Sequence, residues 1–306
     1  MGSRRFFLGF LLLWAGISAP WAAALPLAVV VTTADLKSLA EAVGGERVAV
    51  TALVPANADP ENYQPRVSDL GSLKAAALVI RVGADYDLWF DRLLAQAGRP
   101  ELKRGGAAHV DASFAIALLD VRGASLGQTG HAHGSGNPHY WLDPANAEII
   151  SGNIAEALIR RDPAHAKEYE QRRLRFLERL SARQAEWTRR LAPFAGRPLL
   201  AYHNTWAYFA RRFRLNFAGY LELKPGVPPS PAHMAGLLKR MRDERIALIV
   251  RQPSDPARDA EYLAQRGGAR VVVLAASVGA LPEAHDYLSL FDVNVARLAA
   301  AFGGNP

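Results

Sequence analysis

The sequence predicts an α/β protein of two similar domains, each with a parallel-type sheet flanked by helices, joined by one long rigid helix. Short β-branched runs alternate with amphipathic stretches, which is the pattern of βα units built on parallel sheets. This alternation occurs twice. Residues 163–191 separate the two sets, are rich in charge, and lack glycine and internal proline, as expected of a single helix.

The first 24 residues have the parts of a secretory signal peptide. Arg4 and Arg5 precede an apolar run over residues 6–17, and a small-residue cleavage pattern follows. We therefore expect residues 1–24 to be removed and the mature chain to be periplasmic. The arginine pair with the aromatic residues after it also resembles the twin-arginine consensus, so the general secretory and twin-arginine routes both stay open.

Each predicted domain has four strands. In the N-terminal domain, residues 25–162, the strands are expected at 28–32, 48–53, 77–82 and 109–111, and a last helix at 146–161. In the C-terminal domain, residues 197–306, the strands are expected at 199–202, 216–220, 247–250 and 270–274, and the helices at 206–213, 231–244, 258–265 and 285–302.

The linking segment, residues 163–196, is predicted to begin sharply. Asp162 is expected to cap the long helix, and Pro163 to occupy its first position, where a missing backbone N–H costs nothing. The segment is interpreted as a rigid connector between the two domains.

Composition excludes several classes of function. The 306 residues include no cysteine, so we expect no disulfide framework, thiolate metal site or lipid-anchored start. The formal net charge is +7, but the basic residues concentrate at helical spacing within 172–190, as on a solvated helix face. No basic patch interleaved with aromatic residues is present, so nucleic acid is not an expected partner.

Two loop segments, residues 56–65 and 123–138, interrupt the regular pattern and are the first places where binding residues are expected. Residues 123–138 are rich in glycine and histidine, and three histidines lie close together at His131, His133 and His139. Imidazole is a strong ligand for borderline metals, so this cluster indicates either a metal site or a polar loop.

Two further signals are ambiguous when taken alone. His203 follows a predicted strand, where α/β sheets usually bind ligands, yet a lone histidine there is more often structural. Residues 59–65 (DPENYQP) have carboxylates that are ordinarily turn formers.

Together these segments resemble the zinc/manganese-type solute-binding proteins of ABC importers, the ZnuA/TroA-like or cluster A-I family. Residues 59–65 are similar to a DPHxYxP loop and residues 137–144 (NPHYWLDP) to an NPHxWLDP segment, and the likeness extends over nearly the whole mature chain. The resemblance implies a metal ion bound in the cleft between two α/β domains, an ABC permease as partner, a monomer, and no enzymatic activity.

The resemblance also implies the metal ligands. His139 and His203 match the second and third family ligands, and Glu61 stands where the family usually has its first histidine. Near the end, Ala276 stands where the family commonly has an aspartate. Water, Glu222 or Asp255 then remain open as the fourth ligand.

His131 and His133 lie where zinc-specific members of the family have a mobile histidine-rich loop, which favours Zn²⁺ over Mn²⁺. Three alternatives stay open: a Mn²⁺-binding protein, a binding protein for a metal chelate or other small ligand, and a zinc hydrolase. The hydrolase is disfavoured because the chain has no His-Glu-x-x-His helix.

Overall fold

A computed structural model of the protein describes residues 25–120, 136–224 and 226–303. The expected signal peptide lies outside these residues. Within the described part of the chain, no helix is both long and apolar enough to cross a membrane.

The first sheet is parallel and has four strands in the order β2-β1-β3-β4. Its central strands are almost entirely buried and apolar, as expected of a parallel sheet covered on both faces. The strands are β1 (Leu27–Val31), β2 (Val48–Ala52), β3 (Leu78–Arg81) and β4 (His109–Asp111). The associated helices are α1 (Ala34–Gly44), α2 (Val67–Ala75), α3 (Trp89–Ala97) and α4 (Asn146–Arg161).

The second sheet repeats this topology in the order β6-β5-β7-β8, again with every pair parallel. Its strands are β5 (Pro198–Ala201), β6 (Asn216–Tyr220), β7 (Leu248–Arg251) and β8 (Arg270–Val273). The associated helices are α6 (Ala207–Phe213), α7 (Pro231–Asp243), α8 (Ala257–Gly267) and α9 (Tyr287–Gly303). The predicted fold class is therefore confirmed.

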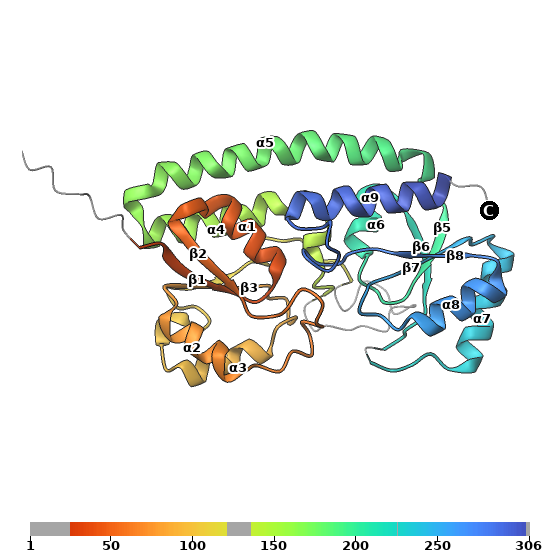
Figure 1. Ribbon diagram of the computed structural model, residues 1–306, viewed down its shortest axis with the longest axis horizontal. Coiled ribbons are helices and arrows are strands. Elements are labelled where there is room, and N and C mark those ends of the chain that lie inside the picture. The colour runs from red at the N-terminus through yellow and green to blue at the C-terminus, as the bar shows by residue number, and fades with distance from the viewer. Residues whose placement is uncertain (1–24, 121–135, 225, 304–306) are drawn as a thin grey trace, which may run out of the picture.

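The linking helix α5 (Ala166–Leu191) has 26 residues and runs along one side of the molecule over both sheets (Figure 1). It buries an apolar stripe at helical spacing, formed by Tyr169, Phe176, Leu180, Trp187 and Leu191. Trp187 packs on Phe291 of α9, with ring centroids 5.0 Å apart. One continuous hydrophobic core thus joins the two halves beneath α5.

The start of α5 differs from the prediction. Asp162 makes no capping hydrogen bond, and Pro163 opens a short 3-10 turn, Pro163–His165, that precedes the α-helix. The Asp162 carboxylate instead accepts a hydrogen bond from Tyr169 Oη at 2.7 Å and contacts His165 Nδ1 at 2.7 Å. The Tyr169 and His165 side chains hold the carboxylate away from the backbone N–H groups at the start of the helix, so the predicted cap was wrong.

Candidate metal centre

Three residues that are far apart in the sequence meet between the two halves of the molecule. Glu61 and His139 precede α5 and His203 follows it, and each offers a ligand atom within 4.8 Å of the other two. His139 Nε2 lies 3.7 Å from Glu61 Oε1. The His139 and His203 ring centroids are 5.7 Å apart. The carboxylate and two imidazoles therefore face a common point.

The loop that holds Glu61 is fixed by local hydrogen bonds. The Asp59 carboxylate accepts from the Glu61 backbone N–H at 2.9 Å and from Asn62 Nδ2 at 2.7 Å, which forms an Asx turn. The Pro60 carbonyl accepts from Trp89 Nε1 at 2.8 Å. Asp59, which was a turn former in the sequence pattern, thus holds the backbone of the loop at Glu61.

His139 is buried and held by its own segment. Its backbone N–H donates to Asn137 Oδ1 at 3.0 Å, and its ring Nδ1 lies 3.1 Å from the same oxygen. Because an amide oxygen only accepts, Nδ1 bears the proton and Nε2 presents its lone pair toward Glu61. The rings of Tyr86 and Trp141 pack against the imidazole at centroid distances of 5.3 and 5.4 Å.

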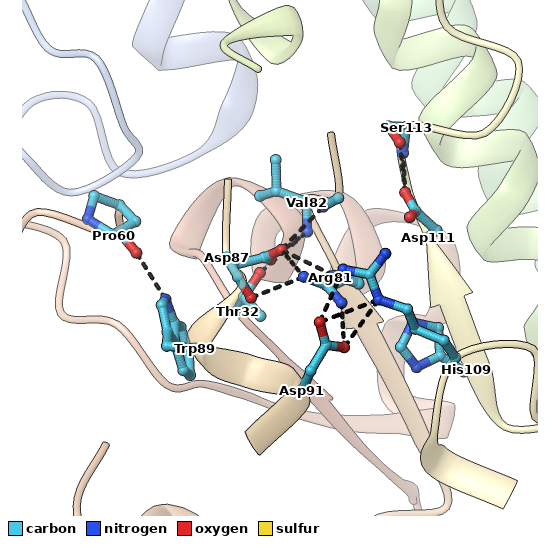
Figure 2. A network of polar contacts seen from close by, with 12 residues as sticks. Thr32, Pro60, Arg81, Val82, Asp87, Trp89, Asp91, His109, Asp111 and Ser113 are labelled. Atoms are coloured by element: carbon cyan, nitrogen blue, oxygen red, sulfur yellow. Dashed lines mark hydrogen bonds and ion pairs between the residues drawn. The ribbon is translucent and has the colours of Figure 1, made fainter. Parts of the chain in front are cut away.

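A buried ion network shapes the loop that carries Tyr86 (Figure 2). Arg81 and Asp87 are both fully buried, and the Arg81 Nε–Asp87 Oδ1 distance is 2.9 Å. Asp87 also accepts from the backbone N–H groups of Val82 at 2.8 Å and Gly83 at 3.2 Å. Gly83 has φ +76, and a Cβ there would lie only 1.9 Å from an Asp111 oxygen, so no larger residue fits.

His203 lies just after β5 and is supported by Glu222, which lies just after β6. His203 Nδ1 is 2.6 Å from Glu222 Oε2, and both side chains are largely buried. The sequence pattern placed Glu222 among possible fourth ligands. In the structure, Glu222 Oε2 instead contacts Nδ1 of His203. It lies outside the three-residue ligand cluster.

Burial and neighbouring charges shift the acid–base properties of the centre. Burial raises the pKa of Glu61 to about 7, and the nearby carboxylates of Asp59 and Glu222 add to this effect against the opposing charge of His203. Burial lowers the pKa of His203, but its hydrogen bond to Glu222 and the charge of Glu61 outweigh burial and raise it. In the metal-free protein, Glu61 and His203 therefore compete for protons near neutral pH.

The three residues line an open cleft of about 520 Å³. Asp255 also lines it, and burial raises the pKa of its carboxyl to about 6. One Asp255 oxygen accepts from the Gln252 backbone N–H at 2.7 Å, and the residue is not part of the ligand cluster. Ala276 does not line this cleft but lines a small adjoining cavity of about 40 Å³ that shares His139 with it.

The donor set suits a small divalent metal ion. Four-coordinate zinc holds nitrogen and oxygen ligands at about 2.0–2.2 Å, which places neighbouring donor atoms roughly 3.4 Å apart. The 3.7 Å separation of His139 Nε2 and Glu61 Oε1 is close to this value. Three protein ligands leave one position open toward the cleft. The other sequence candidates, His131 and His133, lie outside the described residues.

The sequence did not predict the hydrogen bonds that join the two halves beside the centre, between Asp35 and Trp141 on one side and residues 276–278 on the other. The Asp35 carboxylate of α1 accepts from Ser277 Oγ at 2.6 Å and from the Val278 N–H at 2.9 Å. Trp141 Nε1 donates to the Ala276 carbonyl at 2.9 Å. Asp35 does follow the first strand at its carboxyl end, which is a signal for a functional acid, but its partner is 242 residues away.

Comparison with known proteins identifies relatives that are named for metal binding or for metal transport. The chain is 25% identical over 291 residues to the iron-binding protein YfeA of Yersinia pestis, covering 90% of this chain and 86% of that protein. It is 24% identical over 234 residues to the manganese ABC transporter substrate-binding lipoprotein PsaA of Streptococcus pneumoniae, covering 74% and 72%.

A crystal structure of ZnuA has the same fold, with a TM-score of 0.78, 24% identity, and coverage of 90% of this chain and 99% of that one. Residues 29–301 match the family described as zinc-uptake complex component A, periplasmic. Since this match spans most of the chain, the protein belongs to the ZnuA family of metal-binding substrate-binding proteins.

Proposed function

We propose that the protein captures Zn²⁺ with high affinity in the periplasm, through Glu61, His139 and His203, and delivers it to an ABC importer permease. The observation that carries this proposal is the convergence of these three side chains on one point of the cleft, although two of them precede α5 in the sequence and the third follows it. Two imidazoles and one carboxylate are a common zinc ligand set, and imidazole favours zinc over manganese. The family description adds support through its reference to zinc uptake.

The proposed mechanism is binding without turnover. An ion held by Glu61 and His139 on one side and His203 on the other favours the closed arrangement, because it has higher affinity for that arrangement. Docking to the permease would reverse this preference and release the ion. The continuous core under α5 limits the movement to small tilts of the two halves.

The test is zinc affinity of the untagged mature protein after removal of metal with a chelator and reloading with one equivalent. We expect one tightly bound Zn²⁺ in the parent and none in a His139→Ala/His203→Ala double variant. His285→Ala, which removes an exposed histidine from another part of the chain, is the matched control and should bind like the parent. Competition with Mn²⁺ in the same assay measures the selectivity.

Two results would overturn the proposal. The first is a parent that binds no free Zn²⁺, or that binds zinc only as a preformed chelate. The second is zinc binding that persists unchanged in the double variant, since the ion would then be held elsewhere.

A further inference from the structure

The ends of two neighbouring strands place Glu222 beside His203. After β5 and β6, the parallel pairing continues, with the Leu221 N–H donating to the Ala201 carbonyl at 3.0 Å. The Glu222 N–H then donates to the Tyr202 carbonyl at 2.8 Å. Glu222 and His203 are therefore brought together by backbone register, before their side chains interact.

Both oxygens of the Glu222 side chain make a hydrogen bond. Oε2 lies 2.6 Å from His203 Nδ1, and Oε1 accepts from the Gly226 N–H at 2.7 Å. Gly226 has φ +72, a left-handed conformation that favours glycine and turns the chain back toward the carboxylate. The carboxylate is thus fixed at both ends, and its distance to Nδ1 is typical of a charge-assisted hydrogen bond.

We propose that Glu222 is a positioning residue for the metal centre: its carboxylate holds the proton on His203 Nδ1, so that Nε2 presents its lone pair to the ion shared with Glu61 and His139. This inference rests on the proposed function and names a residue outside its ligand set. The same carboxylate holds the ring orientation, because rotation of the imidazole would break the contact with Oε2.

The two histidines of the centre differ in this respect. His139 Nδ1 faces the neutral amide oxygen of Asn137, whereas His203 Nδ1 faces an anionic oxygen. An ionised acceptor makes the imidazole a stronger donor to a metal ion than a neutral one does. His203 is therefore the ligand whose affinity depends most on its supporting residue.

The first experiment measures Zn²⁺ affinity of the full-length mature protein by chelator competition. We expect Glu222→Ala to weaken binding by about 10- to 100-fold, as loss of a residue that supports a metal-bound histidine does. The zinc affinity of Glu222→Gln should fall between those of Glu222→Ala and the parent, because the amide oxygen can still accept the hydrogen bond from His203 Nδ1 but bears no charge. Asp259→Asn removes an equal charge from the lining of the same cleft and is the matched control, expected to bind like the parent.

A second measurement uses the metal-free protein and so does not depend on zinc binding. Long-range ¹⁵N–¹H spectra report which ring nitrogen of His203 carries the proton. We expect the neutral ring to be protonated on Nδ1 in the parent and to become a mixture of tautomers in Glu222→Ala.

The outcomes separate this inference from the proposed function. If the parent binds no Zn²⁺, the proposed function fails, and the tautomer spectra still decide whether Glu222 sets the His203 ring. If the parent binds tightly but Glu222→Ala binds equally well, or the tautomer is unchanged, the positioning role is wrong. Equal losses in Asp259→Asn and Glu222→Gln would show a general effect of charge in the cleft and would also overturn it.

Discussion

Glu61 and His139 face one another across the candidate metal centre, with Glu61 Oε1 3.7 Å from His139 Nε2. They come from two different loops, and each loop is held by its own hydrogen bonds to Asp59 and Asn137. The centre is therefore largely organised before an ion binds. A metal ion that binds there must displace protons from the ligand atoms.

Zinc binding should release a proton from Glu61. Since the Glu61 pKa is raised to about 7, the metal-free carboxyl is protonated below that pH and must ionise to become a ligand. Apparent zinc affinity should therefore fall as pH drops through 7. Calorimetry in buffers with different ionisation enthalpies counts the released protons near pH 6.5.

Glu61→Gln is the variant for this prediction. This variant should lose the proton release assigned to residue 61. It should also weaken zinc binding by more than about 100-fold, the upper end of the effect of losing a residue that supports a ligand. Asp243→Asn alters an exposed carboxylate in another part of the chain and should retain the release. Unchanged proton release in Glu61→Gln would show that another group is titrating.

Asp35→Asn should stabilise the protein at neutral pH. Burial raises the Asp35 pKa from 3.8 to about 6, so the folded state holds its proton more tightly than the unfolded state does. Its contribution to stability is thus fully present below pH 3.8 and is lost as pH rises through 6. An asparagine can donate to Ser277 and accept from Val278 without bearing charge, so we expect a gain on the order of 1–3 kcal/mol at pH 8.

Urea unfolding at pH 8 and pH 5 checks the sign. The advantage of Asp35→Asn should shrink at pH 5, where the parent carboxyl is protonated. Asp243→Asn changes an exposed carboxylate and should give little difference at either pH. A constant advantage at both pH values would contradict the role assigned to Asp35 ionisation.

The fold was predictable because the two central strands of each sheet are largely buried. β3 is an uninterrupted apolar run until Arg81, and such a run leaves few alternatives to a parallel strand. The predicted strand limits differ from the observed ones by at most one residue at either end, and those of β4 and β6 coincide with the observed limits. The cap at Asp162 failed because Tyr169 and His165 compete for its carboxylate.

Glu61, His139 and His203 were brought together as candidate metal ligands only by the resemblance. Nothing in the spacing of Glu61, His139 and His203 relates them, because the topology of two sheets brings them together. The Asp35–Ser277 contact joins positions 242 residues apart, and the position of Asp35 after β1 does not indicate this partner. The sequence left Glu222 open as a fourth ligand and did not predict its contact with His203 Nδ1, which depends on the register of β5 and β6.

Asp87→Ala should be strongly destabilising. It removes the main partner of a fully buried arginine, Arg81, and leaves the Val82 N–H without that acceptor. Breaking a buried ion pair by removing one member costs about 3–5 kcal/mol. Asp91→Ala is the matched control, since Asp91 is partly exposed and its loss leaves the Arg81–Asp87 pair intact, and it should cost about 1 kcal/mol. Urea unfolding compares the two, and equal losses would contradict the prediction.

Arg212 should matter more to the metal centre than the adjacent Arg211. The Asp143 carboxylate, almost fully buried, ends the segment that carries His139. Arg212 binds it with two contacts, Nε–Oδ1 at 2.6 Å and Nη2–Oδ2 at 3.1 Å, whereas Arg211 makes one at 3.4 Å. Because Arg212 is about one-third exposed, solvent screens part of this pair, and Arg212→Ala should cost about 1–3 kcal/mol of unfolding free energy.

Arg211→Ala is the matched control and should cost less than about 1 kcal/mol, as exposed pairs do. The same variants should differ in zinc affinity. Loss of Arg212 leaves the Asp143 carboxylate short of its closest cation and loosens the segment on which the His139 backbone and ring are fixed, so the ligand is less well ordered before binding. Urea unfolding measures the effect on stability, and chelator competition measures the effect on zinc affinity. The prediction is wrong if Arg212→Ala loses stability but binds Zn²⁺ as tightly as Arg211→Ala does.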